Sequence, residues 1–290
     1  MNTPVEVAFA TPSELGEGPF WHAGRLHWVD IEAGVLHRLD VTRGMHEAWA
    51  LGEKLGAAAP HARGGFVVAL ASRVAWFDPA SDRLETIAVP EPELGPRRFN
   101  DGKCDPRGRF VVGTLDLQTR PGVGALYRID PDGHWEKLLP SVGLSNGLAW
   151  SADGGTFYFI DTAQRTLTAY DYDLADGRVS KPRVIWTAPA EEGGPDGMTI
   201  DAAGRLWVGL WGGRSVVCID PTKGDIVERI GLPVDLATAC TFGGVAGDEL
   251  FITTARVGYS SEKRREQPLA GAVFRCRPGA GGPEAFSFGG

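Results

Sequence analysis

Six short apolar runs recur at a nearly constant spacing, and this repeat constrains the fold more than any other feature of the chain. The runs span residues 24–30 (GRLHWVD), 65–70 (GFVVAL), 108–114 (GRFVVGT), 155–161 (GTFYFID), 204–210 (GRLWVGL) and 248–254 (DELFITT). Runs this short, rich in Val, Ile, Phe, Trp and Tyr and bounded by Gly or Asp, are typical of antiparallel strands. A period of about 40 to 50 residues is that of a four-stranded propeller blade.

The rest of each unit supports the same reading. Second apolar runs follow the markers, for example at residues 35–40, 125–130 and 215–220. The 40 glycines and 20 prolines are spread along the chain, so they indicate turns. Long helical periodicity is absent, and no linker-like segment divides the chain. We therefore predict an all-β fold, a single six-bladed β-propeller domain over residues 1–290. Residues 5–9 alternate like a strand and are expected to close the ring beside residues 271–276.

Four of the six units carry a polar residue followed by glycine just before the marker. The pairs are Glu17-Gly18, Asp101-Gly102, Asn146-Gly147 and Asp196-Gly197. They precede the marker glycines by seven, seven, nine and eight residues, which is nearly the same position in the repeat. The innermost strands of a propeller line its central channel. The four polar side chains are therefore expected to converge at one end of the channel. Units two and six hold Ala or Cys here, at 57–58 and 239–240, which leaves one side open for a ligand.

Three carboxylates and an amide in a partly enclosed space repel one another, and a cation relieves this repulsion. Oxygen ligands of this kind favour a hard divalent ion such as Ca²⁺, Mg²⁺ or Mn²⁺. We predict one divalent metal at the end of the channel, with Ca²⁺ first by ligand type and Zn²⁺ or Fe²⁺ left open. The histidines do not share this position in the repeat, so no His ligand is expected; they are His22, His27, His37, His46, His61 and His134.

Each pair has an alternative interpretation, because Asp-Gly and Asn-Gly are common tight turns. Four pairs at one position of the repeat favour the site. Arg98 and Asn100 lie just before Asp101, where they could bind oxygen atoms of a substrate. The adjacent Arg97 is expected at the solvated surface.

Net charge limits the partners that this chain is expected to bind, and the cysteines indicate its redox compartment. The net charge is −8, which disfavours nucleic acid because phosphate binding needs a surplus of Lys and Arg. The N-terminus lacks the pattern of a secretory signal, and no apolar stretch is long enough to span a bilayer. The four cysteines form no CxxC pair, so we expect buried, reduced thiols in a cytoplasmic protein. A monomer or weak homo-oligomer is expected.

Several motifs together resemble one known family. They are residues 15–19 (LGEGP), 98–103 (RFNDGK), 105–109 (DPRGR), 113–114 (GT), 145–150 (SNGLAW), 195–198 (PDGM), 210–213 (LWGG) and 253–256 (TTAR). The set resembles the senescence-marker-protein (regucalcin), gluconolactonase and luciferin-regenerating-enzyme family, in order and over nearly the whole chain. In character it is nearer to the bacterial sugar-acid lactonases.

The resemblance implies a metal-dependent lactonase. Its substrate would be an aldonolactone, a 1,4- or 1,5-lactone such as arabinono-, xylono-, galactono- or gluconolactone, opened to the aldonic acid in sugar catabolism. The implied metal ligands are Glu17, Asn146 and Asp196. Asp196 would also be the general acid/base, with Asp101, near the metal, as the alternative. Arg98 and Asn100 would bind the substrate.

One departure and two rival functions stay open. Animal members carry an acidic pair after the Gly-Thr motif, whereas this chain reads LDLQ at 115–118, so substrate contacts from Asp116 or Gln118 are undecided. The same oxygen-rich site would also suit a calcium-dependent phosphotriesterase resembling diisopropylfluorophosphatase. A calcium-binding propeller without catalysis is the second rival. No Gly-x-Ser-x-Gly motif of a serine esterase is present.

Overall fold

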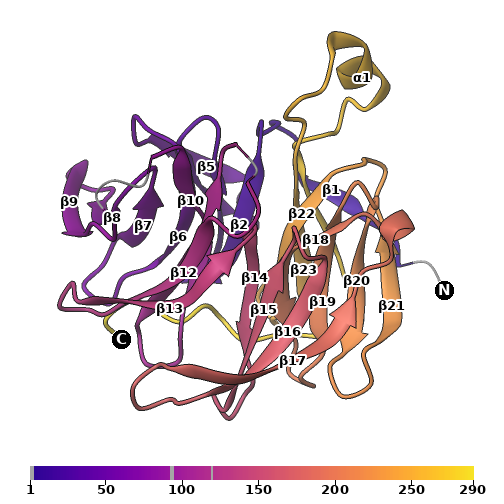
Figure 1. Cartoon of the computed structure of the whole chain (residues 1–290). Coiled ribbons are helices and arrows are strands. Elements are labelled where there is room, and N and C mark those ends of the chain that lie inside the picture. Colours follow the sequence, from indigo (N-terminus) through magenta and orange to yellow (C-terminus); the bar gives the residue numbers. More distant parts are fainter. Residues whose placement is uncertain (1–2, 92–94, 119) are drawn as a thin grey trace.

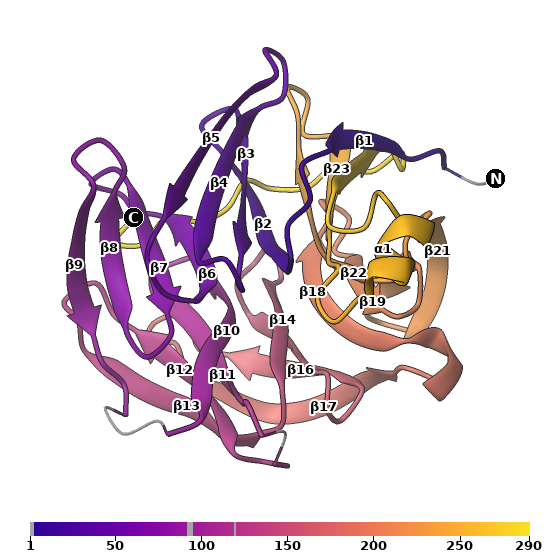
Figure 2. The same cartoon turned by 90° about the horizontal axis from the view of Figure 1, so that it is seen from above.

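Six four-stranded antiparallel sheets stand around a central channel (Figures 1 and 2). The structure is a computed structural model that describes residues 3–91, 95–118 and 120–290. The predicted all-β, six-bladed propeller is confirmed. Residues 1 and 2, where the N-terminal segment assessed for a secretory signal begins, lie outside the described residues.

The first three blades follow one another along the chain, each running from its innermost to its outermost strand. Blade 1 consists of β2 (Gly16–His22), β3 (Arg25–Asp30), β4 (Val35–Asp40) and β5 (Met45–Ala50). Blade 2 consists of β6 (Leu55–Pro60), β7 (Phe66–Leu70), β8 (Val74–Asp78) and β9 (Arg83–Ala88). Blade 3 consists of β10 (Arg97–Cys104), β11 (Phe110–Asp116), β12 (Gly124–Ile129) and β13 (Trp135–Val142).

The last three blades repeat this order, except that the final blade borrows a strand. Blade 4 consists of β14 (Ser145–Trp150), β15 (Thr156–Asp161), β16 (Thr166–Tyr172) and β17 (Val179–Thr187). Blade 5 consists of β18 (Gly194–Ile200), β19 (Leu206–Trp211), β20 (Ser215–Asp220) and β21 (Asp225–Gly231), preceded by a 3₁₀ turn (Ala190–Glu192). Blade 6 consists of β22 (Ala237–Gly243), β23 (Glu249–Thr254), β24 (Val273–Cys276) and β1 (Glu6–Phe9).

The N-terminal strand closes the ring as predicted. Strand β1 pairs antiparallel with β24, so that Glu6 lies opposite Arg275 and Val7 opposite Phe274. Between β23 and β24 the chain leaves the blade and forms the short helix α1 (Ser261–Glu266), which projects from the propeller (Figure 1). None of the helices in the described ranges has the length and apolarity that crossing a bilayer requires.

Burial falls from the channel outward. Every residue of β6, β14 and β22 is buried, because an innermost strand is packed between neighbouring blades on both faces. In the outermost strand β5 no residue is buried, and each is exposed or half-buried. Apolar clusters fill the spaces between adjacent blades. The repeat in the sequence is therefore a repeat of strands that are buried to different extents.

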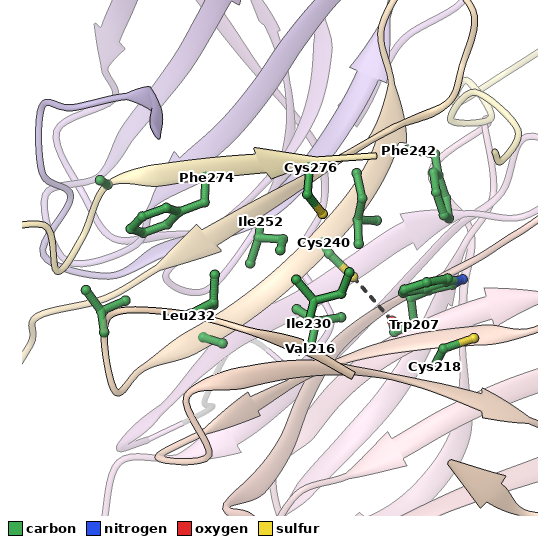
Figure 3. Packing of buried hydrophobic residues seen from close by; sticks show 14 of the residues in the cluster. Trp207, Val216, Cys218, Ile230, Leu232, Cys240, Phe242, Ile252, Phe274 and Cys276 are labelled. Carbon is green, nitrogen blue, oxygen red and sulfur yellow. Dashed lines mark hydrogen bonds between the residues drawn. The ribbon is translucent and has the colours of Figure 1, made fainter. Parts of the chain in front are cut away.

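The cysteines belong to these clusters. All four are free and buried, as predicted. Figure 3 shows three of them, Cys218, Cys240 and Cys276, among the aromatic and aliphatic side chains between blades 5 and 6. The Cys240 thiol donates a hydrogen bond to the carbonyl of Trp207 at 3.3 Å, and burial raises its pKa to about 12. Thiols in this state are protonated and inert.

Candidate metal centre

All six innermost strands share an irregularity at the same level of the channel. The register against the second strand shifts between Glu17 and Phe20, Leu55 and Ala57, Phe99 and Gly102, Asn146 and Leu148, Pro195 and Met198, and Ala237 and Cys240. Such β-bulges re-aim side chains. The four polar-Gly pairs lie inside strands at these bulges, so the alternative that they form hairpin turns is wrong.

In three of the four pairs the glycine serves close packing around the axis, at Gly102, Gly147 and Gly197. A Cβ atom on Gly147 would lie 2.6 Å from Cδ1 of Ile160 and 2.8 Å from the carbonyl oxygen of Asp196. The glycine amides also hold the preceding carboxylates in place. Gly18 N–H donates to Oε2 of Glu17 at 2.9 Å, and Gly102 N–H donates to Oδ1 of Asp101 at 2.8 Å.

Glu17, Asp101 and Asp196 come together in a buried cluster, where each is no more than 5% exposed. Burial, with repulsion from Asp101 second, raises the pKa of Glu17 to about 8. Burial followed by repulsion from Glu17 and Asp101 raises the pKa of Asp196 well above its usual range. A hydrogen bond joins the carboxyl groups of Glu17 and Asp196.

Asn146 is held at both ends of its amide. Its Nδ2 donates to Oγ1 of Thr162 at 2.9 Å, and this hydroxyl donates to the carbonyl of Pro195, beside Asp196, at 2.7 Å. Its Oδ1 accepts from Nδ2 of Asn100 at 3.1 Å and keeps a second lone pair. The orientation of the amide is therefore set by its partners. Thr162 follows the fourth marker run, and nothing in the repeat singles it out.

Arg98 and Asn100 lie beside this cluster, 7% and 6% exposed. Nη1 of Arg98 donates to Oδ1 of Asn100 at 2.6 Å and to the carbonyl of Phe99 at 2.9 Å. Asn100 also donates to the carbonyl of Ser145 at 2.8 Å, so both ends of its amide have protein partners. Nε of Arg98 is buried without a partner among the described residues. Arg98 thus retains a donor for a ligand, whereas Asn100 is used to orient Asn146.

The other residues near the motif have separate partners. Arg97 forms an ion pair with Glu91 at 2.9 Å. Asp116 is gripped by the guanidinium of Arg120, at 3.0 Å from Nε and 2.8 Å from Nη2, which lowers its pKa to about 2. Gln118 is exposed. The carboxylate of Asp116 is therefore engaged locally.

A cavity of about 600 Å³ continues the channel beyond the carboxylates. Its walls are formed by the innermost strands past the bulges, with small residues such as Gly102 and Ala149, and it extends to the C-terminal residues 282–286. Lys103 projects into it and donates to the carbonyl of Met198 at 2.5 Å. The residue is half-buried, and burial lowers the pKa of its ammonium group. Glu17, Asp101 and Asp196 are not among the residues that line this cavity.

The oxygen atoms of these side chains are of the chemical type that binds a divalent cation. Glu17 and Asp196 supply carboxylate oxygens and Asn146 an amide oxygen, the ligands that hard cations prefer. Burial and mutual repulsion raise the pKa of both carboxyl groups, and a bound cation would offset that repulsion. Within residues 3–91, 95–118 and 120–290, no group of three or more His, Cys, Asp or Glu side chains is placed to hold a metal. The amide of Asn146 is consequently required for a third side-chain ligand.

Comparison with known proteins gives the family. Residues 15–256 match the model of the SMP-30/Gluconolactonase/LRE-like region. The chain belongs to this family. It is 36% identical over 282 residues to YvrE of Bacillus subtilis (strain 168), which is named as a candidate sugar lactone lactonase. The match covers 97% of each chain. It is 35% identical over 278 residues to regucalcin of Bos taurus, covering 93% of each.

A solved structure agrees along the whole chain. Regucalcin from Agrobacterium tumefaciens, described as a calcium-binding protein, superimposes with a TM-score of 0.94 at 28% identity. The match covers 99% of this chain and 98% of that one. The sequence resemblance is confirmed, and the names of the relatives support a hydrolase of the lactonase and gluconolactonase class.

Proposed function

We propose that this protein is a metal-dependent lactonase that hydrolyses an aldonolactone to the aldonic acid. The observation that supports the proposal is that the buried carboxyl groups of Glu17 and Asp196 share a hydrogen bond, while Asn146 is linked through Thr162 to the backbone beside Asp196. The relatives named as sugar lactone lactonase and regucalcin support the same reaction class.

Glu17, Asn146 and Asp196 would hold the cation, with Asp101 beside them. A bound divalent cation, Ca²⁺ first by ligand type, would supply a Lewis acid for the lactone carbonyl oxygen and for the charge that develops on it. The chain contributes ligands whose positions are set before binding. The glycine amides hold Glu17 and Asp101, and Thr162 and Asn100 hold Asn146.

Proton transfer falls to the same carboxylates. Hydrolysis adds water to the carbonyl carbon, breaks its bond to the ring oxygen, and requires one proton to leave the water and one to reach that oxygen. Asp196 is our choice for the general base and later acid, with Asp101 as the alternative, because both are buried beside the reaction centre. Arg98 would orient the sugar through its unpartnered Nε.

The test is hydrolysis of an aldonolactone panel by protein stripped with EDTA. Arabinono-, xylono-, galactono- and gluconolactone are each assayed with Ca²⁺, Mg²⁺, Mn²⁺, Zn²⁺ or Fe²⁺ added back singly. We expect hydrolysis above the spontaneous rate only when a cation is present. Hydrolysis of organophosphates alone would favour the phosphotriesterase, and calcium binding without any turnover would favour the non-catalytic propeller.

Asp196→Asn tests the assignment of the base. The amide retains an oxygen ligand and the size of the side chain, so we expect the fold and measurable metal binding to persist. It cannot accept the proton, so kcat should fall by at least about 100-fold, the usual contribution of general base catalysis. Turnover like that of the wild type would refute this role, and Asp101→Asn is the parallel variant that tests the alternative.

A further inference from the structure

A second cluster of ionisable side chains lines a small groove between blades 1 and 2. The groove has a volume of about 170 Å³. Its ionisable lining residues are His22, Arg25, His27, Arg38 and His61. His22 ends the strand that carries Glu17 near its start, so the groove lies at the opposite end of β2 from the carboxylate cluster.

Every ionisable side chain that lines the groove is basic, although the chain as a whole carries a net charge of −8. Arg38 is paired with Glu47 at 2.7 Å, which leaves part of its guanidinium unused. Within the described ranges, Arg25 forms no ion pair and no acidic residue contributes to the lining. Arg25 therefore has no counter-ion among the described residues, whereas Glu47 and Glu284, from outside the lining, face Arg38 and His22 respectively.

His27 provides an independent indication of a ligand. Its ring is stacked on Phe20, with centroids 4.7 Å apart and an angle of 5° between the planes, and the residue is 2% exposed. Its Nδ1 is buried and has no hydrogen-bond partner among the described residues. Leaving such an atom unpaired is costly, so a water molecule or a bound ligand is expected to complete its hydrogen bonding. Burial, then the nearby His22 and Arg38, lowers the pKa of His27 to about 3, as expected where positive charge is uncompensated.

His61 adds a donor on the facing blade. Its Nδ1 accepts a hydrogen bond from the backbone N–H of Arg63 at 3.2 Å, so the neutral ring carries its proton on Nε2. Donors thus come from two blades and from both sides of the groove. Several charged and neutral donors around a small space suit a multivalent oxyanion, and Arg is the side chain best matched to phosphate geometry.

We propose that this groove is a phosphate-binding site, which takes inorganic phosphate or the phosphate group of a small monoester. Arg25 and the unpaired part of Arg38 would meet the charge. His27 and His61 would donate or share hydrogen bonds with the remaining oxygens. A carboxylate would leave donors unused, because it offers two oxygens where a phosphate monoester offers three that are free.

The test is calorimetric titration of the full-length protein with inorganic phosphate at pH 7, in calcium-free buffer of constant ionic strength. We expect saturable 1:1 binding to the wild type. Arg25→Gln should weaken it by at least about tenfold, the cost of losing one charge-assisted hydrogen bond to a dianion. Arg43→Gln is the matched control, since Arg43 is in the same blade, with a side chain 70% exposed and outside the groove, and should bind as the wild type does.

His27→Phe removes the unpartnered nitrogen while keeping a ring to stack on Phe20, and should also weaken binding. The thermal unfolding of this variant is first compared with that of the wild type. If the variant does not fold, Arg25→Gln alone tests the proposal. A hexose 6-phosphate titrated in parallel identifies the source of the phosphate by binding more tightly or more weakly than the inorganic ion. Absence of binding by both, or equal affinity in the wild type and both groove variants, would overturn the proposal.

Discussion

At the scale of single residues, the carboxyl pair Glu17 and Asp196 shows how strongly burial acts in this channel. Without a cation, desolvation and mutual repulsion raise the pKa of both groups and so favour their protonated forms. The pair titrates as a unit rather than as two independent acids. This behaviour makes the proposed metal visible in the stability of the protein, independently of its activity.

Stability of the metal-free protein should fall as pH rises. The pKa of Glu17 is about 8 in the folded state against 4.5 for the ordinary group, so its protonated form favours folding. This contribution is complete below pH 4.5 and is lost as pH rises through 8. Urea unfolding of EDTA-treated protein at pH 5, 7 and 8 measures it. Glu17→Gln should show a smaller decline, and added Ca²⁺ should stabilise the wild type most at pH 8. A decline of equal size in both proteins would contradict this explanation.

Thr162 is expected to set metal affinity without touching the metal. Thr162→Val removes the hydroxyl that links Asn146 to the carbonyl of Pro195, so the amide loses its fixed orientation. Calcium affinity, measured by calorimetry, should fall by at least about tenfold, as is usual when a group that orients a ligand is removed. Thr162→Ser keeps the hydroxyl and should restore affinity. If Thr162→Val changes only the thermal stability, Thr162 has no part in orienting Asn146.

At the scale of elements, the bulges in the innermost strands decide where polar side chains point. Gly147 can be tested because the bulge in β14 leaves no room for a side chain. Gly147→Ala should lower the free energy of unfolding by about 1 to 3 kcal/mol, the usual cost of overpacking, and weaken calcium binding. Gly231→Ala is the control, because a Cβ there meets nothing within 4 Å and the backbone is not left-handed. Similar losses in both variants would argue against a special role of the bulge.

The blades and the level of the site could be predicted from sequence because both follow from a period. The marker runs recur about every 40 to 50 residues, which is the length of one blade. One position within that repeat is shared by Glu17, Asp101, Asn146 and Asp196. The hydrogen bonds that Asn146 donates to Thr162 and accepts from Asn100 could not be predicted, since they depend on side chains brought together from different parts of the chain. Helix α1 was also missed, because its six residues are too few to show a period.

At the scale of the whole molecule, two segments far apart in sequence fasten the ring. Strand β1 completes blade 6 beside β24. The C-terminal strap, residues 278–290, then runs on beneath several blades (Figure 1). Backbone hydrogen bonds join the strap to Ala202 in blade 5, Gly247 in blade 6, Pro60 in blade 2 and Gly108 in blade 3. Contacts that bridge several blades stabilise the closed ring, which sequential pairing within each blade does not do.

Phe288 is the anchor of this strap. It is 1% exposed and packs into the cluster between blades 2 and 3, while its N–H donates to the carbonyl of Pro60 at 2.8 Å. Phe288→Ala should lower the free energy of unfolding by about 3 kcal/mol, measured by urea titration, because it leaves a cavity in a packed core. Phe286→Ala removes the same group two residues away, where the side chain is 43% exposed, and should cost less than about 1 kcal/mol. The difference between the two variants isolates anchoring from the loss of a phenyl ring. Equal effects would mean that the strap lies on the propeller without holding its blades together.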